Sequence, residues 1–151
     1  MSARPDESGE QAEDRGEVAP EVAAALAAYA ADATAYLELL RAVLGSRLLL
    51  PMVPIEEGAA MGAALLTSST GRRGLLAFTG IEPLRRWDAD ARPLPVRARE
   101  AAEAALAERA EAVVLDVAGP TRVVIDGEDL AAIARGRTLG FVGDRPAWVP
   151  A

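Results

Sequence analysis

GLLAFTGIEPLRRWD, residues 74–88, decides the fold, because it joins a short strand directly to a compact helix. It holds one of the two Phe and one of the two Trp in the chain. Leu75–Phe78 is an apolar run of strand length, and the preceding GRRG, Gly71–Gly74, predicts a hairpin turn. The spacing of Ile81–Trp87 predicts a short helix after the strand.

Upstream of this stretch the pattern predicts one long helix and two strands. Apolar residues recur every three or four positions between Pro20 and Gly45, with a possible break and a new helix cap at Asp32. Arg47–Val53, RLLLPMV, has strand length, and Pro51 argues for an edge position or a strand end. A loop over 54–62 then precedes a second strand over 63–68.

Downstream, we expect a Pro-punctuated loop and then two helices and two strands. The expected elements are a loop over 88–95, a helix over 98–111, strands over 112–117 and 122–126, and a helix from a cap at Asp126 to about Arg135. This order predicts an α+β fold: a mixed, largely antiparallel sheet of about five strands packed with helices in one domain over 20–137. Residues 138–151 contain too many Gly and Pro to place, so their order stays open.

The charge of the chain is uneven. The net charge is −7, and residues 1–21 contain seven acidic residues against two Arg. We therefore predict a disordered acidic tail over 1–19, followed by a nearly balanced domain. An acidic protein with no apolar signal segment is expected in the cytoplasm, without nucleic acid or a membrane as partner.

The residue types that are missing restrict the chemistry. The chain has no Cys, no His and no Lys, which removes thiolate and imidazole metal ligands, the commonest general base and lysine Schiff-base chemistry. We therefore expect no catalytic residues, no metal site and no cofactor, and a protein that is not an enzyme.

Several segments, taken in order, resemble the SseB family, named for the enhanced serine sensitivity protein B. They are Leu39–Val53 (LLRAVLGSRLLLPMV), Leu75–Thr79 (LLAFT), Leu84 with Trp87, Pro93–Val96, and Val113–Pro120 (VVLDVAGP). The resemblance implies an α+β domain over about 22–135, with no known reaction and no catalytic residues to transfer. Gly80 departs from the pattern, because such sequences often have Ser or Asp there to cap the helix.

The first functional hypothesis is a non-enzymatic interaction or regulatory domain whose partner is another protein. Its surface would consist of Phe78, Thr79, Leu84 and Trp87, with the GRRG turn nearby. The favoured alternative is that Phe78, Leu84 and Trp87 pack in the core. The more specific hypothesis is that a partly exposed Trp87 anchors the interaction, because Trp is enriched at binding hot spots. The oligomeric state stays open.

The second hypothesis is a small-ligand or anion-binding domain. Arg72 with Arg73 and Arg85 with Arg86 form two basic pairs that would gather four guanidinium groups if the turn and the helix lay on the same side. The favoured alternative is that these arginines are solvated surface residues.

A third and weaker hypothesis is an enzyme that uses Asp116, Thr79 or a Tyr. Thr79 would present its hydroxyl at a strand end, but Thr79-x-x-Glu82 also fits a capping box, and Pro83 as first helical residue with Glu82 as cap is a competing register. Asp116 interrupts an apolar strand, and the favoured interpretation is that it points to solvent. The pairs Glu56–Glu57 and Glu128–Asp129 are explained by a loop and by a helix start.

Overall fold

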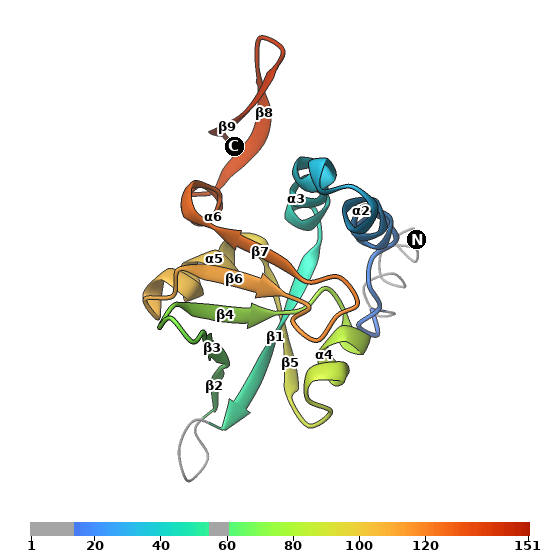
Figure 1. Cartoon of the computed structure of the whole chain (residues 1–151), viewed down its shortest axis with the longest axis vertical. Coiled ribbons are helices and arrows are strands. Elements are labelled where there is room, and N and C mark those ends of the chain that lie inside the picture. Colours follow the sequence, from blue (N-terminus) through green and yellow to red (C-terminus); the bar gives the residue numbers. More distant parts are fainter. Residues whose placement is uncertain (1–13, 55–60) are drawn as a thin grey trace, which may run out of the picture.

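The computed structural model describes residues 14–54 and 61–151, and Figure 1 shows an α+β fold. The helices in this part of the chain are α2 (Pro20–Ala31), the 3-10 turn η1 (Ala33–Ala35), α3 (Tyr36–Leu44), α4 (Ile81–Trp87), α5 (Ala98–Ala107) and α6 (Gly127–Ala134). The strands are β1 (Arg47–Pro54), β2 (Met61–Ala63), β3 (Leu65–Thr67), β4 (Arg73–Ala77), β5 (Arg92–Arg97), β6 (Ala112–Leu115), β7 (Val123–Asp126), β8 (Arg137–Val142) and β9 (Arg145–Pro150). The predicted α+β class and the helix break at Asp32 are confirmed, and the Asp32 carboxylate accepts a hydrogen bond from the Thr34 N–H.

The described strands form three sheets instead of one sheet of about five strands. Their orders are β2-β1-β5, β3-β4-β6-β7 and β8-β9. Every pairing is antiparallel except that of β4 with β6, which is parallel. Leu49 and Phe78 exchange two backbone hydrogen bonds of 2.8 Å, which join β1 to the residue that follows β4. The mixed, largely antiparallel character therefore agrees with the sequence pattern, and the number of strands exceeds it.

The expected loop over 88–95 is wrong in its second half, because β5 pairs with β1 along its whole length. Two prolines occur in β5, and they are tolerated because β5 is an edge strand. Pro51 was expected at an edge position or a strand end, but it lies inside β1, which has partners on both sides. Pro51 lies between the bridge at Leu49 and the start of pairing with β2 at Met52, where no partner needs an N–H from it.

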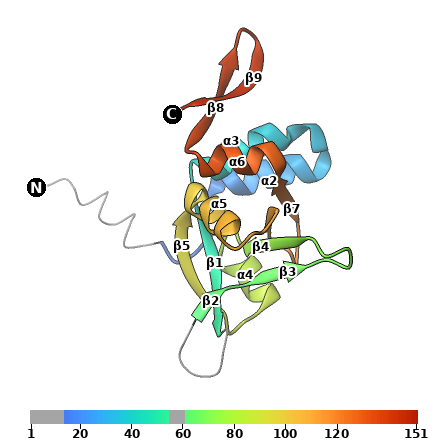
Figure 2. The ribbon, with the colours of Figure 1, turned by 90° about the vertical axis from the view of Figure 1, so that its left-hand side faces the viewer.

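The β3-β4-β6-β7 sheet separates two apolar clusters. Alternate side chains of the sheet, among them Leu75, Val113 and Ile125, pack with α3, α5 and α6 in the larger cluster. Leu76 and Val114 point to the other face and pack under α4. Figure 2 shows α5 and α6 on one side of β4 and α4 on the other. The sheet thus has one face covered by several helices and one face that only the short α4 covers in part.

We predicted a disordered tail over 1–19. This prediction is wrong for residues 14–19, which lie against the domain. The residues before Asp14 fall outside the described range. The Gly16 carbonyl accepts a 2.6 Å hydrogen bond from the Ile81 N–H. Arg47 donates to the Glu17 carbonyl at 2.6 Å and to the Asp14 carboxylate at 3.0 Å. These bonds attach the segment to the start of α4 and to the first residue of β1.

Gly80 permits this attachment, so Gly80→Ala is expected to release the segment. A Cβ at Gly80 would lie 2.6 Å from Val18 Cγ2 and 2.9 Å from the Gly16 carbonyl oxygen. Overpacking of this kind costs about 1–3 kcal/mol. Trypsin should therefore cleave after Arg15 faster in the variant. Gly45→Ala is the control, because its Cβ would meet its nearest atoms at 3.8 Å; equal cleavage rates in the two variants would contradict the assignment.

Of the stretch that the sequence left unplaced, residues 138–150 belong with Arg137 to a β-hairpin that projects from the domain (Figure 1). At its base Leu139 is buried, and the Trp148 indole N–H donates a 2.9 Å hydrogen bond to the Asp129 carboxylate. An isolated two-stranded hairpin is marginal in water, so these contacts are what attach it. Near its tip Phe141 and Val142 are 62% and 65% exposed.

Candidate functional site

The parallel strands β4 and β6 end side by side, and each is followed by a buried polar residue. Ala77 pairs with Leu115; Asp116 directly follows Leu115, and Thr79 lies two residues after Ala77. The Asp116 carboxylate accepts two hydrogen bonds from Thr79, 2.8 Å from its N–H and 2.7 Å from its hydroxyl. Thr79 is 2% exposed and Asp116 is 1% exposed. This pair therefore places a carboxylate and an oriented hydroxyl at the carboxyl end of the sheet, where open sheets commonly bind ligands.

Two of the sequence expectations fail at this pair. Asp116 was expected to point to solvent, but the chain turns after Leu115 into a left-handed conformation at Asp116, with φ of 52°, and its side chain is buried. Thr79 was expected to cap α4, but the N-cap residue is Gly80 and no side chain caps the helix. The Thr79 hydroxyl donates to Asp116 instead, so neither proposed capping register forms.

Burial and hydrogen bonding act in opposite directions on the Asp116 carboxyl. Burial raises the pKa of Asp116 above its usual 3.8, and the two hydrogen bonds from Thr79 offset part of that rise. The Thr79 hydroxyl donates its single proton in the hydrogen bond to Asp116, so its oxygen can only accept further hydrogen bonds. A carboxylate also only accepts. The groups that this buried pair can offer to a ligand are therefore hydrogen-bond acceptors.

A cavity of about 340 Å³ opens onto this pair, and we call it the Asp116 cavity. Its walls come from the segment before α2, from α2, from α4 and from the β6–β7 loop. It is lined by Val18, Ala23, Leu26, Ala27, Thr79, Glu82, Pro83, Arg86, Asp116, Pro120 and Thr121. Most of these residues are apolar, and the few polar groups gather around Asp116 and along α4, as in small-molecule sites.

The residues predicted to form an interaction surface are mainly core residues. Phe78 and Leu84 are completely buried, so with the buried Thr79 they have almost no side-chain surface to offer a partner. Trp87 is half-buried and lies against Phe78, with 5.9 Å between ring centroids. The core-packing interpretation therefore describes Phe78 and Leu84, and Trp87 exposes only part of its ring.

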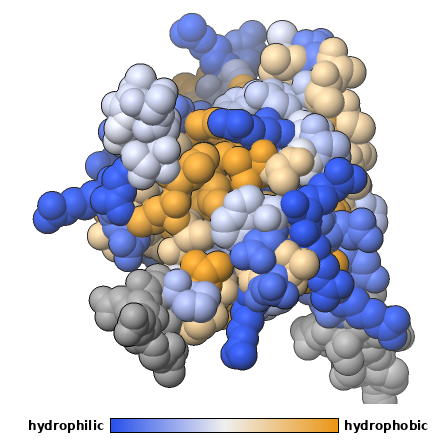
Figure 3. All heavy atoms as spheres, turned by 60° about the horizontal axis from the view of Figure 1, so that its bottom comes forward, coloured by the Kyte–Doolittle hydropathy of each residue, from blue (hydrophilic) through white to orange (hydrophobic). Residues whose placement is uncertain are grey.

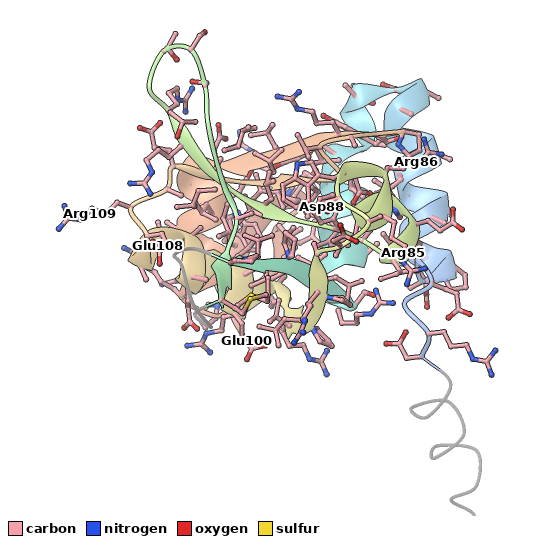
Figure 4. The ribbon with its side chains drawn as sticks, turned by 90° about the horizontal axis from the view of Figure 1, so that it is seen from below. Arg85, Arg86, Asp88, Glu100, Glu108 and Arg109 are labelled. Atoms are coloured by element: carbon pink, nitrogen blue, oxygen red, sulfur yellow. The ribbon has the colours of Figure 1, made fainter. Side chains whose placement is uncertain are left out.

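The four arginines do not gather into one site. Arg72 and Arg73 lie at the start of β4, whereas Arg85 and Arg86 lie on α4, beyond its other end. Figure 4 shows Arg85 and Arg86 on the opposite side of the molecule from the β3–β4 hairpin turn. Arg72 is also paired, at 2.7 Å, with the Glu111 carboxylate. The anion site built from all four guanidinium groups is therefore excluded by the length of the strand between them.

A second concavity, of about 310 Å³, occupies the part of the sheet that α4 leaves uncovered; we call it the open sheet face. It is lined by Leu66, Ser68, Thr70, Arg72, Arg73, Gly74, Glu111, Ala112, Val114, Arg122, Val124 and Asp126. Figure 3, with the lower side turned forward, shows an apolar area in the middle of the molecule, bordered by hydrophilic side chains. Leu66 is 37% and Val124 is 43% exposed, and both lie on this concavity.

Sequence reasoning missed most of the residues that line these two concavities. In β7 the alternation of buried and exposed residues could have identified Val124 as an outward-facing apolar side chain. Arg122 and Leu26 carry no local signal of a cavity, and Glu82 was interpreted only as part of a helix cap. Only the packing of α2, α4 and β7 brings these residues to a cavity. Glu56 and Glu57 lie outside the described residues.

The remaining side chains named for the weaker enzyme hypothesis give it little support. Burial and the nearby Asp129 and Asp126 raise the pKa of Tyr36 far above its ordinary value, so the phenol stays protonated near neutral pH and cannot serve as a general base. Glu128 and Asp129 occupy the first turn of α6, as expected. Within residues 14–54 and 61–151 no three acidic side chains are placed to hold a metal ion. The same part of the chain contains no helix that is both long and apolar enough to cross a bilayer.

Together, these observations define a small α+β domain with two surface concavities. Residues 22–132 match the family model described as the SseB protein N-terminal domain. Since the match covers well over half of the chain, the protein belongs to the SseB family, as the ordered segments of its sequence indicated. No curated protein and no solved structure matches the chain. The C-terminal hairpin lies beyond the matched residues.

Proposed function

We propose that the protein is a non-enzymatic interaction domain of the cytoplasm, and that it binds another protein through the open sheet face. The observation that carries the proposal is the exposure of Leu66 and Val124 on the part of the sheet face that α4 leaves uncovered. Exposed apolar surface with a polar border is typical of protein–protein contact sites. The proposed interaction surface is therefore not the buried Phe78–Trp87 stretch that the sequence suggested but the neighbouring part of the same sheet.

The charges of this face favour a partner segment that has acidic residues beside apolar ones. Arg72 is neutralised by Glu111, and Asp126 lies 3.9 Å from it. Arg73 and Arg122 make no ion pair with any described residue, so the concavity is locally basic on a chain of net charge −7. Complementary charge mainly raises the association rate and the specificity, while the apolar centre supplies affinity.

Substituting Val124→Asp is expected to lower the affinity for the partner at least tenfold, about 1.4 kcal/mol. The partner is first identified by affinity capture with wild-type protein and then titrated, in purified form, with each variant. Val142→Asp is the matched control, because Val142 is exposed on the hairpin, away from this face. Thermal melting of both variants confirms that they are folded.

The charge contribution is tested in the same titration with Arg122→Glu, whose effect should shrink as salt rises. A partner that is lost with Val142→Asp and retained with Val124→Asp would place the contact on the hairpin and contradict the proposal. The proposal is also contradicted if the wild-type protein retains no partner protein at all.

A further inference from the structure

The Asp116 cavity has the composition of a small-molecule site, and the proposed protein contact does not involve it. Its volume of about 340 Å³ is within the range of roughly 300–1,000 Å³ common for ligand pockets. Leu26 of α2 and Pro83 of α4 contribute apolar walls, and Pro120 belongs to the loop after β6. A ligand there would be held between three elements that are distant in sequence.

The inner end of this cavity offers acceptors and no free donor from the Thr79–Asp116 pair. Both Thr79 protons, on nitrogen and on the hydroxyl, are directed at the Asp116 carboxylate. Two bonds use about half of the acceptor capacity of a carboxylate, and the Thr79 oxygen keeps its own lone pairs. A ligand group that reaches this pair must therefore be a donor, and a protonated amine is the donor best suited to a carboxylate.

Arg86 supplies the opposite chemistry in the same cavity. It lies on α4, and Figure 4 shows it beside α2. It makes no ion pair with a described residue, including Glu82 one helical turn earlier, which also lines the cavity. A guanidinium group in this position matches a carboxylate in two-point geometry. Its neighbour Arg85 is also exposed but does not line the cavity.

From this arrangement we infer that the Asp116 cavity binds a small zwitterion. The protonated amine of the ligand lies at Thr79 and Asp116, its apolar body lies along Leu26 and Pro83, and its carboxylate pairs with Arg86. The charge of Glu82 lies on the same wall and disfavours ligands that carry only a carboxylate. Binding is non-covalent, and no bond is made or broken.

Four probes of six carbons each separate the parts of this inference. Norleucine and aminohexanoate carry both charges, hexylamine carries the amine alone, and hexanoate carries the carboxylate alone. Each is titrated into the full chain by calorimetry and by amide NMR. We expect at least one zwitterion to bind at least tenfold more tightly than both singly charged probes, with NMR shifts in Thr79 and in α4.

Three variants test the residues. Arg86→Gln should weaken the zwitterion at least tenfold, whereas Arg85→Gln, next to it on the same exposed helix, should leave its affinity unchanged. Thr79→Val keeps the shape but removes the oxygen acceptor, and it should also weaken binding. Because Thr79 is buried, its variant counts only if its melting temperature shows a folded protein; Arg86→Gln at the surface tests the inference regardless.

Three results would overturn the inference. The first is that neither zwitterion shifts any resonance of the lining residues. The second is that hexylamine binds as tightly as the zwitterions, which would remove Arg86 from the site. The third is that Arg85→Gln and Arg86→Gln weaken binding equally, which would indicate non-specific charge attraction. Since none of these probes is a protein, a negative result here does not affect the proposed protein contact on the open sheet face, which the Val124→Asp titration tests separately.

Discussion

Phe78→Ala is expected to lower the free energy of unfolding by about 3–5 kcal/mol, the usual cost of removing a buried aromatic ring. Phe78 is completely buried between the two larger sheets and packs with Leu76, Leu84 and Trp87. Its backbone also bridges to Leu49, so a cavity at this position loosens the junction of β1 with β4. Urea unfolding followed by Trp fluorescence measures the loss.

Two companion variants show whether the loss comes from the cavity. Phe78→Leu retains most of the apolar volume and should cost clearly less than Phe78→Ala. Trp87→Ala removes a larger ring, but because that ring is half-buried we expect a smaller loss than from Phe78. A loss below about 1 kcal/mol for Phe78→Ala would show that this cluster does not hold the sheets together.

Asp116→Ala is expected to lower the free energy of unfolding by about 3 kcal/mol or more. It leaves the buried Thr79 N–H and hydroxyl without their acceptor, and an unpaired buried donor costs about 1–3 kcal/mol. It also places Ala in a left-handed conformation, which costs roughly 1–2 kcal/mol. Asp116→Asn should cost much less, because Asn tolerates this conformation and its amide oxygen still accepts the Thr79 N–H.

The pH dependence of stability supplies an independent check on Asp116. Its pKa is raised in the folded protein, so above pH 3.8 the folded state binds more protons than the unfolded state. Stability from this group therefore falls as pH rises from 3.8 through the folded pKa, and Asp116→Asn should remove that decline. Asp14 and Asp32 have lowered pKa values, so their contributions change below pH 3.8 and with the opposite sign. A decline that persists unchanged in the Asn variant would contradict the assignment.

The sequence predicted the local elements well where a single segment contains the whole signal. The break at Asp32 was predicted because its side chain caps the next turn within two residues. The helix over 81–87 and the strand before it were predicted from the local pattern of residues alone. The strand β5 was missed because its two prolines look like loop residues, and only its place at the edge of the β2-β1-β5 sheet makes them acceptable.

The candidate sites were predicted less well, because each depends on distances between segments. Arg72 with Arg73 and Arg85 with Arg86 are close in sequence, yet β4 keeps the two pairs apart. Phe78 and Trp87 were recognised as partners, but whether such a pair is core or surface depends on Leu49 and Val114, which come from other strands. Thr79 was assigned to its own helix, whereas its hydroxyl is bound by Asp116, which is distant in sequence.

What the sequence determined by itself is the family, the α+β class, the single domain with its acidic beginning, and the restriction of chemistry that follows from the absence of His, Cys and Lys. What only the tertiary structure decided is which polar groups meet. The parallel pairing of β4 and β6 brings Thr79 to Asp116, and the short α4 leaves Leu66 and Val124 uncovered. The physical reason is that periodicity along a chain reports which face of an element is apolar, while contacts between elements depend on how those faces pack together.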